Sequence, residues 1–509
     1  MSDGRTKKAL RNMTFNMGNQ VLTLVLAFVS RTVFIHGLGV AYLGISGLFT
    51  DILNMLSLAD LGFNTAMVYS LYKPLKENDY SKISALIGFY RKIYIIVALT
   101  VAVVGIALIP ALPYIINLET EIPHLTLYYL LSLANVVFSY LCVYKTSLLY
   151  ADQKQYKITT VTIIVSTIRT ILQVVSILLW KSFIVYLVIG CVGAISTNLI
   201  ASHIATKEYP YIKENSTLKK EDRKSIFQNI GSVFLYKLST VLITATDNTL
   251  ISIIVGTIAV GYYSNYLMLQ NKIAMFYVII FSSLTASIGN LIVSESEKKR
   301  YEVFECEQSI SFIICSIIIP CYAILVNDFM RVWLGEPYML SYWTVLAISL
   351  NMYLSCVLQP LWSFREATGL YRQTKWIMTI CALLNLTLSV ILGKLIGLTG
   401  IILATSISKL STYIWYEPRL LFRTYFKKKS IGYYLDIAKN ALLIATIILV
   451  GYLIGKQFVS TTWIYWIIKA ICVGVLSFAV TFAVYYKTSG YKKIKEMIIN
   501  VLPFMKRKI

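Results

Sequence analysis

The chain has 509 residues, of which 57% are hydrophobic and 14% are charged, and its mean hydropathy is +0.69. A soluble domain cannot bury so large an apolar fraction in one core, so the composition excludes a soluble globular protein and indicates a membrane protein. The net charge of +23 would suit a nucleic-acid-binding protein, but basic residues also gather in the cytoplasmic loops of membrane proteins. We therefore expect membrane lipid, and no nucleic acid, as a partner.

Apolar stretches long enough to cross a bilayer follow one another from the N-terminus onward. A spanning helix needs about 20 apolar residues to cross a hydrocarbon core of roughly 30 Å. Six predicted spans precede the first long basic loop: Asn12 to His36, Ala41 to Tyr72, Ile93 to Pro113, Leu125 to Leu149, Ile158 to Trp180 and Phe183 to Thr206.

The remaining predicted spans follow this loop. Six form a second half: Ser225 to Val255, Ala259 to Asn290, Val303 to Val326, Met339 to Trp362, Trp376 to Leu395 and Leu398 to Leu420. Two more, Ile437 to Gly455 and Trp463 to Tyr486, end the series. The predicted fold is an all-α integral membrane protein of about fourteen transmembrane helices, with two six-helix bundles around a central cavity and two C-terminal helices.

This pattern divides the chain into four parts. Residues 1–206 are expected to form the N-terminal six-helix bundle, residues 207–224 a cytoplasmic linker loop, and residues 225–425 the C-terminal six-helix bundle. Residues 426–509 carry helices 13 and 14 and a basic cytoplasmic tail. Most of the 47 Lys and Arg residues lie in the N-terminus and in alternate loops. Positively charged loops stay in the cytoplasm, so both termini are predicted to be cytoplasmic.

Basic residues within the spans are the first candidates for a binding site. A charge at mid-bilayer costs roughly 2.5 to 3.5 kcal/mol, so it normally faces a cavity or a partner and not lipid. Structural ion pairs are the alternative for each residue, and near helix ends, as at Arg31 and Lys469, a side chain can reach back to the interface. The candidates for a substrate-binding cationic cavity are Arg169, Lys237, Lys272, Lys409 and Arg31.

Only three acidic residues are expected to lie within the membrane beside these cations: Asp51, Asp60 and Asp247. The excess of positive charge predicts an anionic substrate, because Arg binds phosphate through two hydrogen bonds and Lys acts as a point charge. The three aspartates are candidates for ion coupling through protons or sodium, with salt bridges to Lys237 or Lys272 as the alternative. No catalytic residue, metal site or cofactor is expected, since the eight cysteines form no CxxC pair and no nucleotide-binding glycine loop occurs.

Several stretches resemble a known transporter family. They are Leu38 to Phe63, Glu208-Tyr209-Pro210, Gly256 to Tyr266, Arg365 to Trp376 and Gly397 to Pro418. The last two, REATGLYRQTKW and GLTGIILATSISKLSTYIWYEP, resemble the family's eleventh and twelfth helices in order and spacing. The chain thus resembles, over essentially its whole length, the polysaccharide transporter family of Wzx-type or O-antigen flippases. That family lies within the multidrug/oligosaccharidyl-lipid/polysaccharide exporter superfamily.

The resemblance implies a function, a location and partners. Such a flippase translocates polyprenyl-diphosphate-linked oligosaccharide repeat units from the cytoplasmic to the outer face of the bacterial cytoplasmic membrane by alternating access. It serves cell-surface polysaccharide biosynthesis together with a polysaccharide polymerase and glycosyltransferases, and it is not an enzyme. The resemblance also implies proton or sodium exchange. It transfers no site residues, because cavity charges in the family vary with the sugar.

Other functions stay open at this point. Multidrug exporters and peptidoglycan-precursor exporters belong to the same superfamily, and the fold alone excludes neither. The cationic interior disfavours cationic drugs. A membrane polymerase or ligase of the same pathway would need a substantial outer loop, whereas the longest outward loops, around Asn117 to His124 and Asn327 to Leu340, are short.

Overall fold

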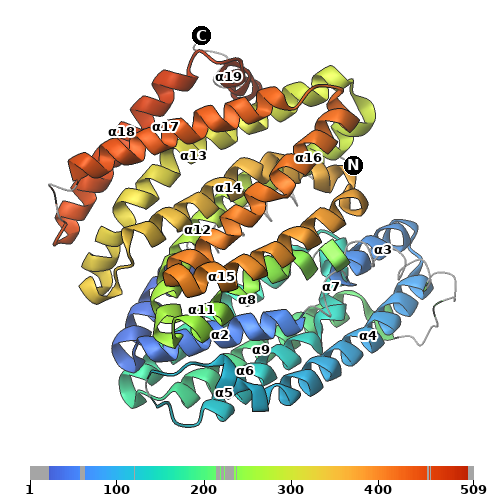
Figure 1. The fold of residues 1–509 in the computed structure, drawn as a ribbon. Coiled ribbons are helices and arrows are strands. Elements are labelled where there is room, and N and C mark those ends of the chain that lie inside the picture. The colour runs from blue at the N-terminus through green and yellow to red at the C-terminus, as the bar shows by residue number, and fades with distance from the viewer. Residues whose placement is uncertain are drawn as a thin grey trace. The chain divides into compact units, whose positions relative to one another are not determined.

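We describe the chain from a computed structural model that covers residues 22–57, 63–119, 121–213, 218, 223, 234–236, 238–455, 458 and 460–501. Every regular element within these residues is a helix, as predicted. The chain divides into two compact units, Met1–Gly261 and Tyr262–Ile509, and each is described by itself (Figure 1). The domain boundaries expected at residues 206, 224 and 425 stay a prediction.

The first unit begins with the helix Leu22–Leu38. Its other helices are α2 (Val40–Leu56), α3 (Phe63–Glu77), α4 (Tyr80–Ala107), α5 (Leu112–Ile115), α6 (Leu125–Tyr140), α7 (Val143–Ala151), α8 (Gln155–Trp180), α9 (Phe183–Glu208) and α11 (Asp247–Ile254). Helix α4 begins where the Asp79 carboxylate accepts a hydrogen bond from the Lys82 backbone nitrogen at 2.9 Å, which satisfies an otherwise free amide. Helices α6 and α7 meet at a bend of 48°.

Aromatic and small residues set the packing of the first unit. An aromatic cluster joins the first helix, α2, α6 and α9: Phe34, Tyr42, Tyr128, Phe183 and Tyr186. At Gly105, α4 comes so close to α6 that a Cβ atom would lie 2.5 Å from Leu133 Cδ1. The Tyr129 hydroxyl then donates to the Gly105 carbonyl oxygen at 3.0 Å. Helices α4 and α6 are therefore fastened by both shape and a buried hydrogen bond.

Helix α12 (Thr257–Ser294) begins in the first unit, and most of its length belongs to the second. The second unit continues with α13 (Glu297–Leu334), α14 (Tyr342–Thr368), α15 (Tyr371–Ser411), α16 (Tyr413–Leu421), α17 (Ile431–Gly455), α18 (Trp463–Tyr485) and α19 (Ser489–Val501). The long α15 is broken at Ile396 and Gly397, where Gly397 has a φ of 61°, a conformation that glycine adopts without steric cost. This break falls between the two spans predicted for this stretch.

Helix α13 is the central helix of the second unit. It packs against α14, α17, α18 and α19, and Figure 1 shows α17 and α18 running alongside it. The amide of Asn440 on α17 is fully buried and donates to Ser316 Oγ of α13 at 2.8 Å and to Tyr485 Oη of α18 at 2.9 Å. Because a buried amide is costly unless it is hydrogen-bonded, Asn440 fixes the register of these three helices.

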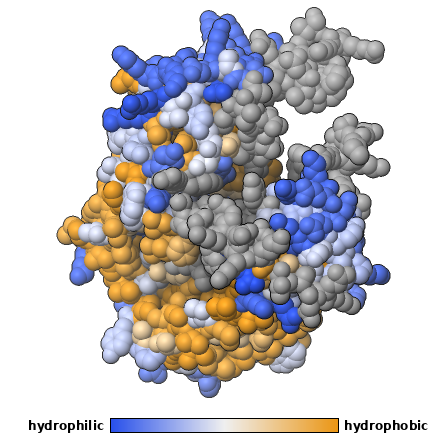
Figure 2. Space-filling view, turned by 90° about the vertical axis from the view of Figure 1, so that its right-hand side faces the viewer, coloured by the Kyte–Doolittle hydropathy of each residue, from blue (hydrophilic) through white to orange (hydrophobic). Residues whose placement is uncertain are grey.

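The helices match the demands of a bilayer. Among the described residues, eight helices are long and apolar enough to cross a membrane, or nine if the bent pair α6 and α7 forms one span. Helix α8 exposes Ile164, Ile168 and Leu172 on one face, and Figure 2 shows broad apolar patches on the visible surface. Such patches need lipid as their solvent. The prediction of a multi-span helical membrane protein is thus confirmed, whereas fourteen spans in two six-helix bundles around a cavity stay a prediction.

Candidate functional site

Arg169 lies near the middle of α8, and its side chain crosses α9 at Gly193. A Cβ atom at Gly193 would lie 2.7 Å from Arg169 Cδ and 3.0 Å from its Cγ, so glycine leaves the room that the arginine needs. The Nε atom of Arg169 is buried and has no hydrogen-bond partner within the described part of the chain. A guanidinium donor in this condition can be satisfied by an anionic ligand.

Arg31 approaches the same place from the helix Leu22–Leu38. Its guanidinium group and that of Arg169 both lie close enough to Tyr186 of α9 to act electrostatically on the tyrosine hydroxyl. Phe34, which follows Arg31 by almost one turn, packs edge-on against Tyr186 with ring centroids 5.0 Å apart. The fold therefore brings two of the five candidate cations to one tyrosine. Two positive charges held in a medium of low dielectric constant favour an anion nearby.

A second polar site in the first unit joins α2 to α11. The side chain of Asp51 hydrogen-bonds to that of Asn248. Asp247, the second candidate aspartate, is the first residue of α11 and directly precedes Asn248 in the sequence. Gly44 of α2 also packs against the first residue of α12, because a Cβ atom there would lie 2.1 Å from the Thr257 carbonyl oxygen. Carboxylate and amide oxygens are the ligands that hard cations prefer, and carboxylates also bind protons.

In the second unit, Lys409 of α15 lies in a polar seam against α14. Lys409 is 9% exposed, and its Nζ donates to Ser355 Oγ at 3.3 Å. One turn earlier, Ser406 Oγ donates to Asn351 Oδ1 at 2.6 Å, and the Asn351 amide donates to the Ile402 carbonyl oxygen at 2.8 Å. The seam gives the buried ammonium group polar neighbours in an otherwise apolar interior.

Three candidates remain: Lys272, Lys237 and Asp60. Lys272 lies half-buried on α12 of the second unit. Lys237 and Asp60 lie outside the described residues. The described part of the first unit therefore places Arg31 and Arg169 near Tyr186, and Asp51 beside Asn248.

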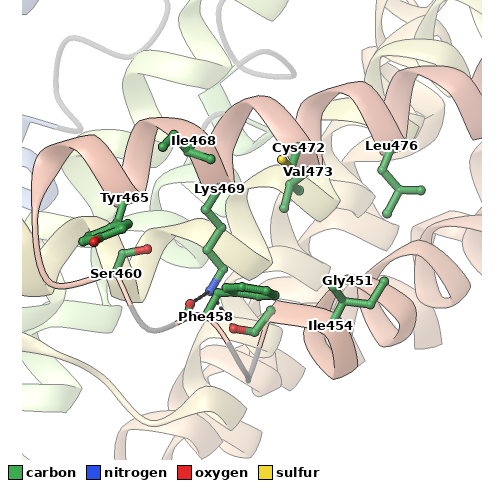
Figure 3. Close-up of a pocket in the computed structure, with 11 residues that line it drawn as sticks. Gly451, Ile454, Phe458, Ser460, Tyr465, Ile468, Lys469, Cys472, Val473 and Leu476 are labelled. Carbon is green, nitrogen blue, oxygen red and sulfur yellow. Dashed lines mark hydrogen bonds between the residues drawn. The ribbon is translucent and has the colours of Figure 1, made fainter.

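Lys469 of α18 does not reach back to the interface as an isolated charge, contrary to the expectation. Its Nζ donates to Asp328 Oδ2 at 2.7 Å and to the carbonyl oxygens of Gly455 and Phe458 at 3.1 Å each. It lines an otherwise largely apolar cavity of about 550 Å³ between α17 and α18, as Figure 3 shows. A buried carboxylate partner is the physical reason, since the ion pair and the two hydrogen bonds to carbonyl oxygens replace hydration.

A second buried ion pair was missed by the sequence analysis. Arg365 of α14 and Glu417 of α16 are 6% and 4% exposed, and Arg365 Nη1 lies 2.7 Å from Glu417 Oε1. Glu417 lies inside a predicted span, whereas Arg365 was expected in a loop. Both belong to the stretches that resemble the transporter family, and in this structure they hold two helices of one unit together.

The expectation that three aspartates are the only acidic residues within the predicted spans is wrong. Glu305, Glu307 and Glu417 also fall inside predicted spans. Glu307 is 2% exposed, and neither of its carboxylate oxygens has a hydrogen-bond partner among the described residues. The interior of the second unit is more nearly balanced in charge than predicted. The case for an anionic ligand consequently rests on Arg31 and Arg169 in the first unit.

The Glu208-Tyr209-Pro210 stretch has a structural role at the end of α9. Glu208 accepts hydrogen bonds from Lys154, at 2.7 Å, and from Lys157. The Tyr209 hydroxyl donates to Asp152 Oδ2 at 2.8 Å. Burial raises the pKa of Tyr209, and the hydrogen bond to the Asp152 carboxylate raises it further. This network ties the loop before α8 to the end of α9.

One family comparison covers more than half of the chain. The model of the polysaccharide biosynthesis protein family matches residues 9–286. A comparison with curated proteins gives no significant match.

Solved structures of transporters share the fold. The lipid II flippase MurJ, in an inward closed conformation, is similar with a TM-score of 0.62 at 15% identity over 94% of this chain and 99% of that one. An inward-facing multidrug resistance MATE family transporter of the MOP superfamily gives 0.59 at 13% identity over 78% and 95%. The Vibrio cholerae MATE transporter VcmN, in the bent form, gives 0.53 at 14% identity over 82% and 98%. At such identities the likeness concerns the fold alone.

Proposed function

The chain belongs to the polysaccharide biosynthesis protein family, and from this membership we propose that it flips polyprenyl-diphosphate-linked oligosaccharide repeat units from the cytoplasmic to the outer face of the membrane. The chain is a membrane transporter of the multidrug/oligosaccharidyl-lipid/polysaccharide exporter superfamily and not an enzyme. Its proposed role is to supply cell-surface polysaccharide biosynthesis by alternating access between the two faces.

The observation that carries this proposal is the pair of arginines around Tyr186. Arg31 and Arg169 come from different helices, and the Nε of Arg169 is buried without a hydrogen-bond partner among the described residues. A diphosphate has several acceptor oxygens and at least two negative charges, so it compensates both guanidinium groups. A cationic drug would be repelled. This charge arrangement supports a lipid-linked diphosphate over a multidrug substrate.

Lys237, Lys272 and Lys409 complete the proposed set of substrate-binding cations. Lys409 is the member with the clearest setting, because Ser355 and the seam between α14 and α15 hold its ammonium group. A point charge of this kind suits a phosphate that changes position during transport. The carboxylates of Asp51, Asp247 and Asp60 form the proposed coupling set, with Asn248 fixing Asp51.

The proposed setting follows from the same reasoning. We place the protein in the bacterial cytoplasmic membrane with both termini in the cytoplasm, because basic loops resist translocation. A polysaccharide polymerase and glycosyltransferases are the proposed partners. A peptidoglycan-precursor exporter is the second candidate function, since that substrate also carries a lipid-linked diphosphate and the fold is similar to that of the lipid II flippase MurJ.

A binding measurement separates these functions. Purified full-length protein in detergent would be titrated with a polyprenyl-diphosphate oligosaccharide, a peptidoglycan precursor and a cationic drug, and bound species would be counted by native mass spectrometry. We expect the oligosaccharide lipid to bind most tightly and Arg169→Ala to weaken it roughly tenfold to hundredfold, the worth of hydrogen bonds to a charged group. Arg91→Ala, at an exposed arginine of the same unit, is the control. Preference for either other ligand would overturn the proposal.

A further inference from the structure

The end of α16 and the segment that connects it to α17 are strongly basic. Five basic residues lie within eleven positions of the sequence: Arg419, Arg423, Lys427, Lys428 and Lys429. The fold forms an open pocket of about 400 Å³ here, whose lining includes three of these residues: Arg419, Lys428 and Lys429, with Trp415, Ser430 and Tyr434. The pocket belongs to the second unit and contains none of the proposed substrate-binding residues.

The aromatic wall of the pocket is well fixed. The rings of Trp415 and Tyr434 have centroids 4.8 Å apart, and the Tyr434 hydroxyl donates to the Trp415 carbonyl oxygen at 3.0 Å. The same hydroxyl lies close to the side chains of Arg419 and Ser430. Lys428 is positioned by the ring of Tyr301, whose centroid lies 3.5 Å from its Nζ. These contacts hold hydrogen-bond donors around one space.

The carboxylates near the pocket are engaged by other side chains. Glu305, which acts electrostatically on Lys428, accepts hydrogen bonds from Ser489 Oγ and Lys493 Nζ at 2.6 Å each. None of its described lining residues is acidic. Glu417 is buried and engaged by Arg365 at 2.7 Å, and Asp436 pairs with Lys439 at 3.3 Å. Three cations that share a pocket without an acidic lining residue repel one another, so an anion that enters the pocket is favoured.

The surface beside the pocket is apolar. Ile431 lines the pocket, and Leu435 and Leu442 continue on the same face of α17 at 55% and 69% exposure. This face lies on a helix that is apolar and long enough to cross the membrane. Tryptophan and tyrosine side chains prefer the boundary between hydrocarbon and headgroups, which is where Trp415 and Tyr434 would then lie. A ligand that fits both surfaces has an anionic head and apolar tails.

We propose that this pocket binds the phosphate headgroup of an anionic membrane phospholipid, whose acyl chains lie along the Ile431, Leu435 and Leu442 face of α17. Arg419 and Lys429 supply charge and hydrogen-bond donors to the phosphate, and Trp415 and Tyr434 hold the glycerol region at the interface. Basic pockets at the membrane ends of helices bind acidic lipids in this manner. The site is separate from the proposed transport site and does not depend on the transported substrate.

The test uses the purified full-length protein and native mass spectrometry with two lipids that differ in headgroup charge, phosphatidylglycerol and phosphatidylcholine. We expect phosphatidylglycerol to bind more tightly, and Arg419→Gln with Lys429→Gln to lose roughly thirtyfold in affinity, about fivefold for each charge. The control is Lys298→Gln with Lys299→Gln, which removes two exposed charges at the start of α13 of the same unit. Its affinity should stay as in the wild type.

Four results would overturn the proposal. The first is equal binding of both lipids, and the second is an equal loss in the pocket and control variants. The third is equally tight binding of inorganic phosphate alone, because a free anion would then suffice without the apolar face. The fourth result concerns polyprenyl diphosphate, which is titrated in the same way. If it displaces phosphatidylglycerol from the wild type and fails to bind the pocket variant, the site serves the transported lipid. The phospholipid assignment would then be wrong.

Discussion

Arg365 of α14 and Glu417 of α16 form a buried ion pair, with Arg365 Nη1 2.7 Å from Glu417 Oε1. The two residues are 52 positions apart in the sequence, and each is less than a tenth exposed. Removal of one member leaves the other charge in a medium that cannot hydrate it. The pair therefore constrains how α14 and α16 pack within the second unit.

The first prediction concerns this pair. Arg365→Ala and Glu417→Ala should each lower the free energy of unfolding by about 3 to 5 kcal/mol, because an uncompensated buried charge remains. Arg365→Met with Glu417→Leu should cost much less, since both charges are absent. Thermal unfolding in detergent of Arg365→Met, Glu417→Leu and the variant with both, arranged as a double-mutant cycle, measures the coupling. Single variants as stable as the wild type would contradict the structure at this point.

The second prediction concerns the space that Gly193 leaves for Arg169. Gly193→Ala introduces a Cβ atom 2.7 Å from Arg169 Cδ, so the arginine must move, at a cost of about 1 to 3 kcal/mol for overpacking. The folded variant should bind a lipid-linked diphosphate less tightly than the wild type. Gly190→Ala on the same helix is the control, because its nearest atom would be Gln173 Nε2 at 3.4 Å. If both variants bind the lipid equally tightly, Gly193 has no role in the proposed site.

The third prediction separates structural from substrate-binding cations. Lys469→Ala should lower stability, because Asp328 loses its shorter ion pair, at 2.7 Å, and keeps only that to Arg331 at 3.1 Å among the described residues. The folded variant should still bind the diphosphate lipid normally. Arg169→Ala should do the reverse and weaken ligand binding with little loss of stability. Melting temperature and ligand affinity, measured on the same two samples, give the comparison. If both variants lose stability, or both lose ligand affinity, the assignment of Lys469 as structural and Arg169 as substrate-binding is contradicted.

The fourth prediction concerns ion coupling. Asp51→Asn removes the charge and keeps a side chain that can hydrogen-bond to Asn248. The variant should bind substrate but respond no longer to an imposed proton or sodium gradient. Asp436→Asn, at an exposed aspartate paired with Lys439, should keep the response. Transport into liposomes with and without each gradient provides the measurement, and an unchanged gradient response in Asp51→Asn would remove Asp51 from the coupling set.

The fifth prediction concerns pH. Burial alone would lower the pKa of Lys154, but its hydrogen bonds to Asp152 and Glu208 raise the pKa above its ordinary value of 10.5. A raised lysine pKa contributes stability that is complete below the unfolded pKa and is lost as the pH rises through the folded pKa. The loss of melting temperature in Lys154→Ala should thus be constant from neutral pH up to about 9. A penalty that disappears between these limits would contradict the ion pairing.

Local apolar pattern predicted the helices well, because bilayer thickness fixes the length of an apolar run. The predicted span Ile158 to Trp180 agrees with α8 (Gln155–Trp180), and Phe183 to Thr206 agrees with α9 (Phe183–Glu208). The break in α15 at Gly397 was also visible, since a glycine lies between two apolar runs.

Long-range pairing could not be predicted in the same way. Asp328 and Lys469 are 141 positions apart, and no periodicity links them. Glu307 and Glu417 did carry a signal, because a carboxylate inside an apolar span demands a partner or a proton. Their omission produced the overstated excess of positive charge. The proximity of Arg31 and Arg169 to Tyr186 likewise depends on how three helices pack, which hydropathy does not encode.

A flipping assay in proteoliposomes tests the proposed transport activity itself. A polyprenyl-diphosphate oligosaccharide would be placed in the bilayer, and its rate of appearance at the opposite leaflet would be measured for protein-free liposomes, the wild type, Arg169→Ala and the control Arg91→Ala. We expect the wild type and Arg91→Ala to accelerate flipping well above the protein-free rate, and Arg169→Ala to lose that acceleration. No acceleration by folded wild-type protein with several oligosaccharide donors would contradict the proposed function.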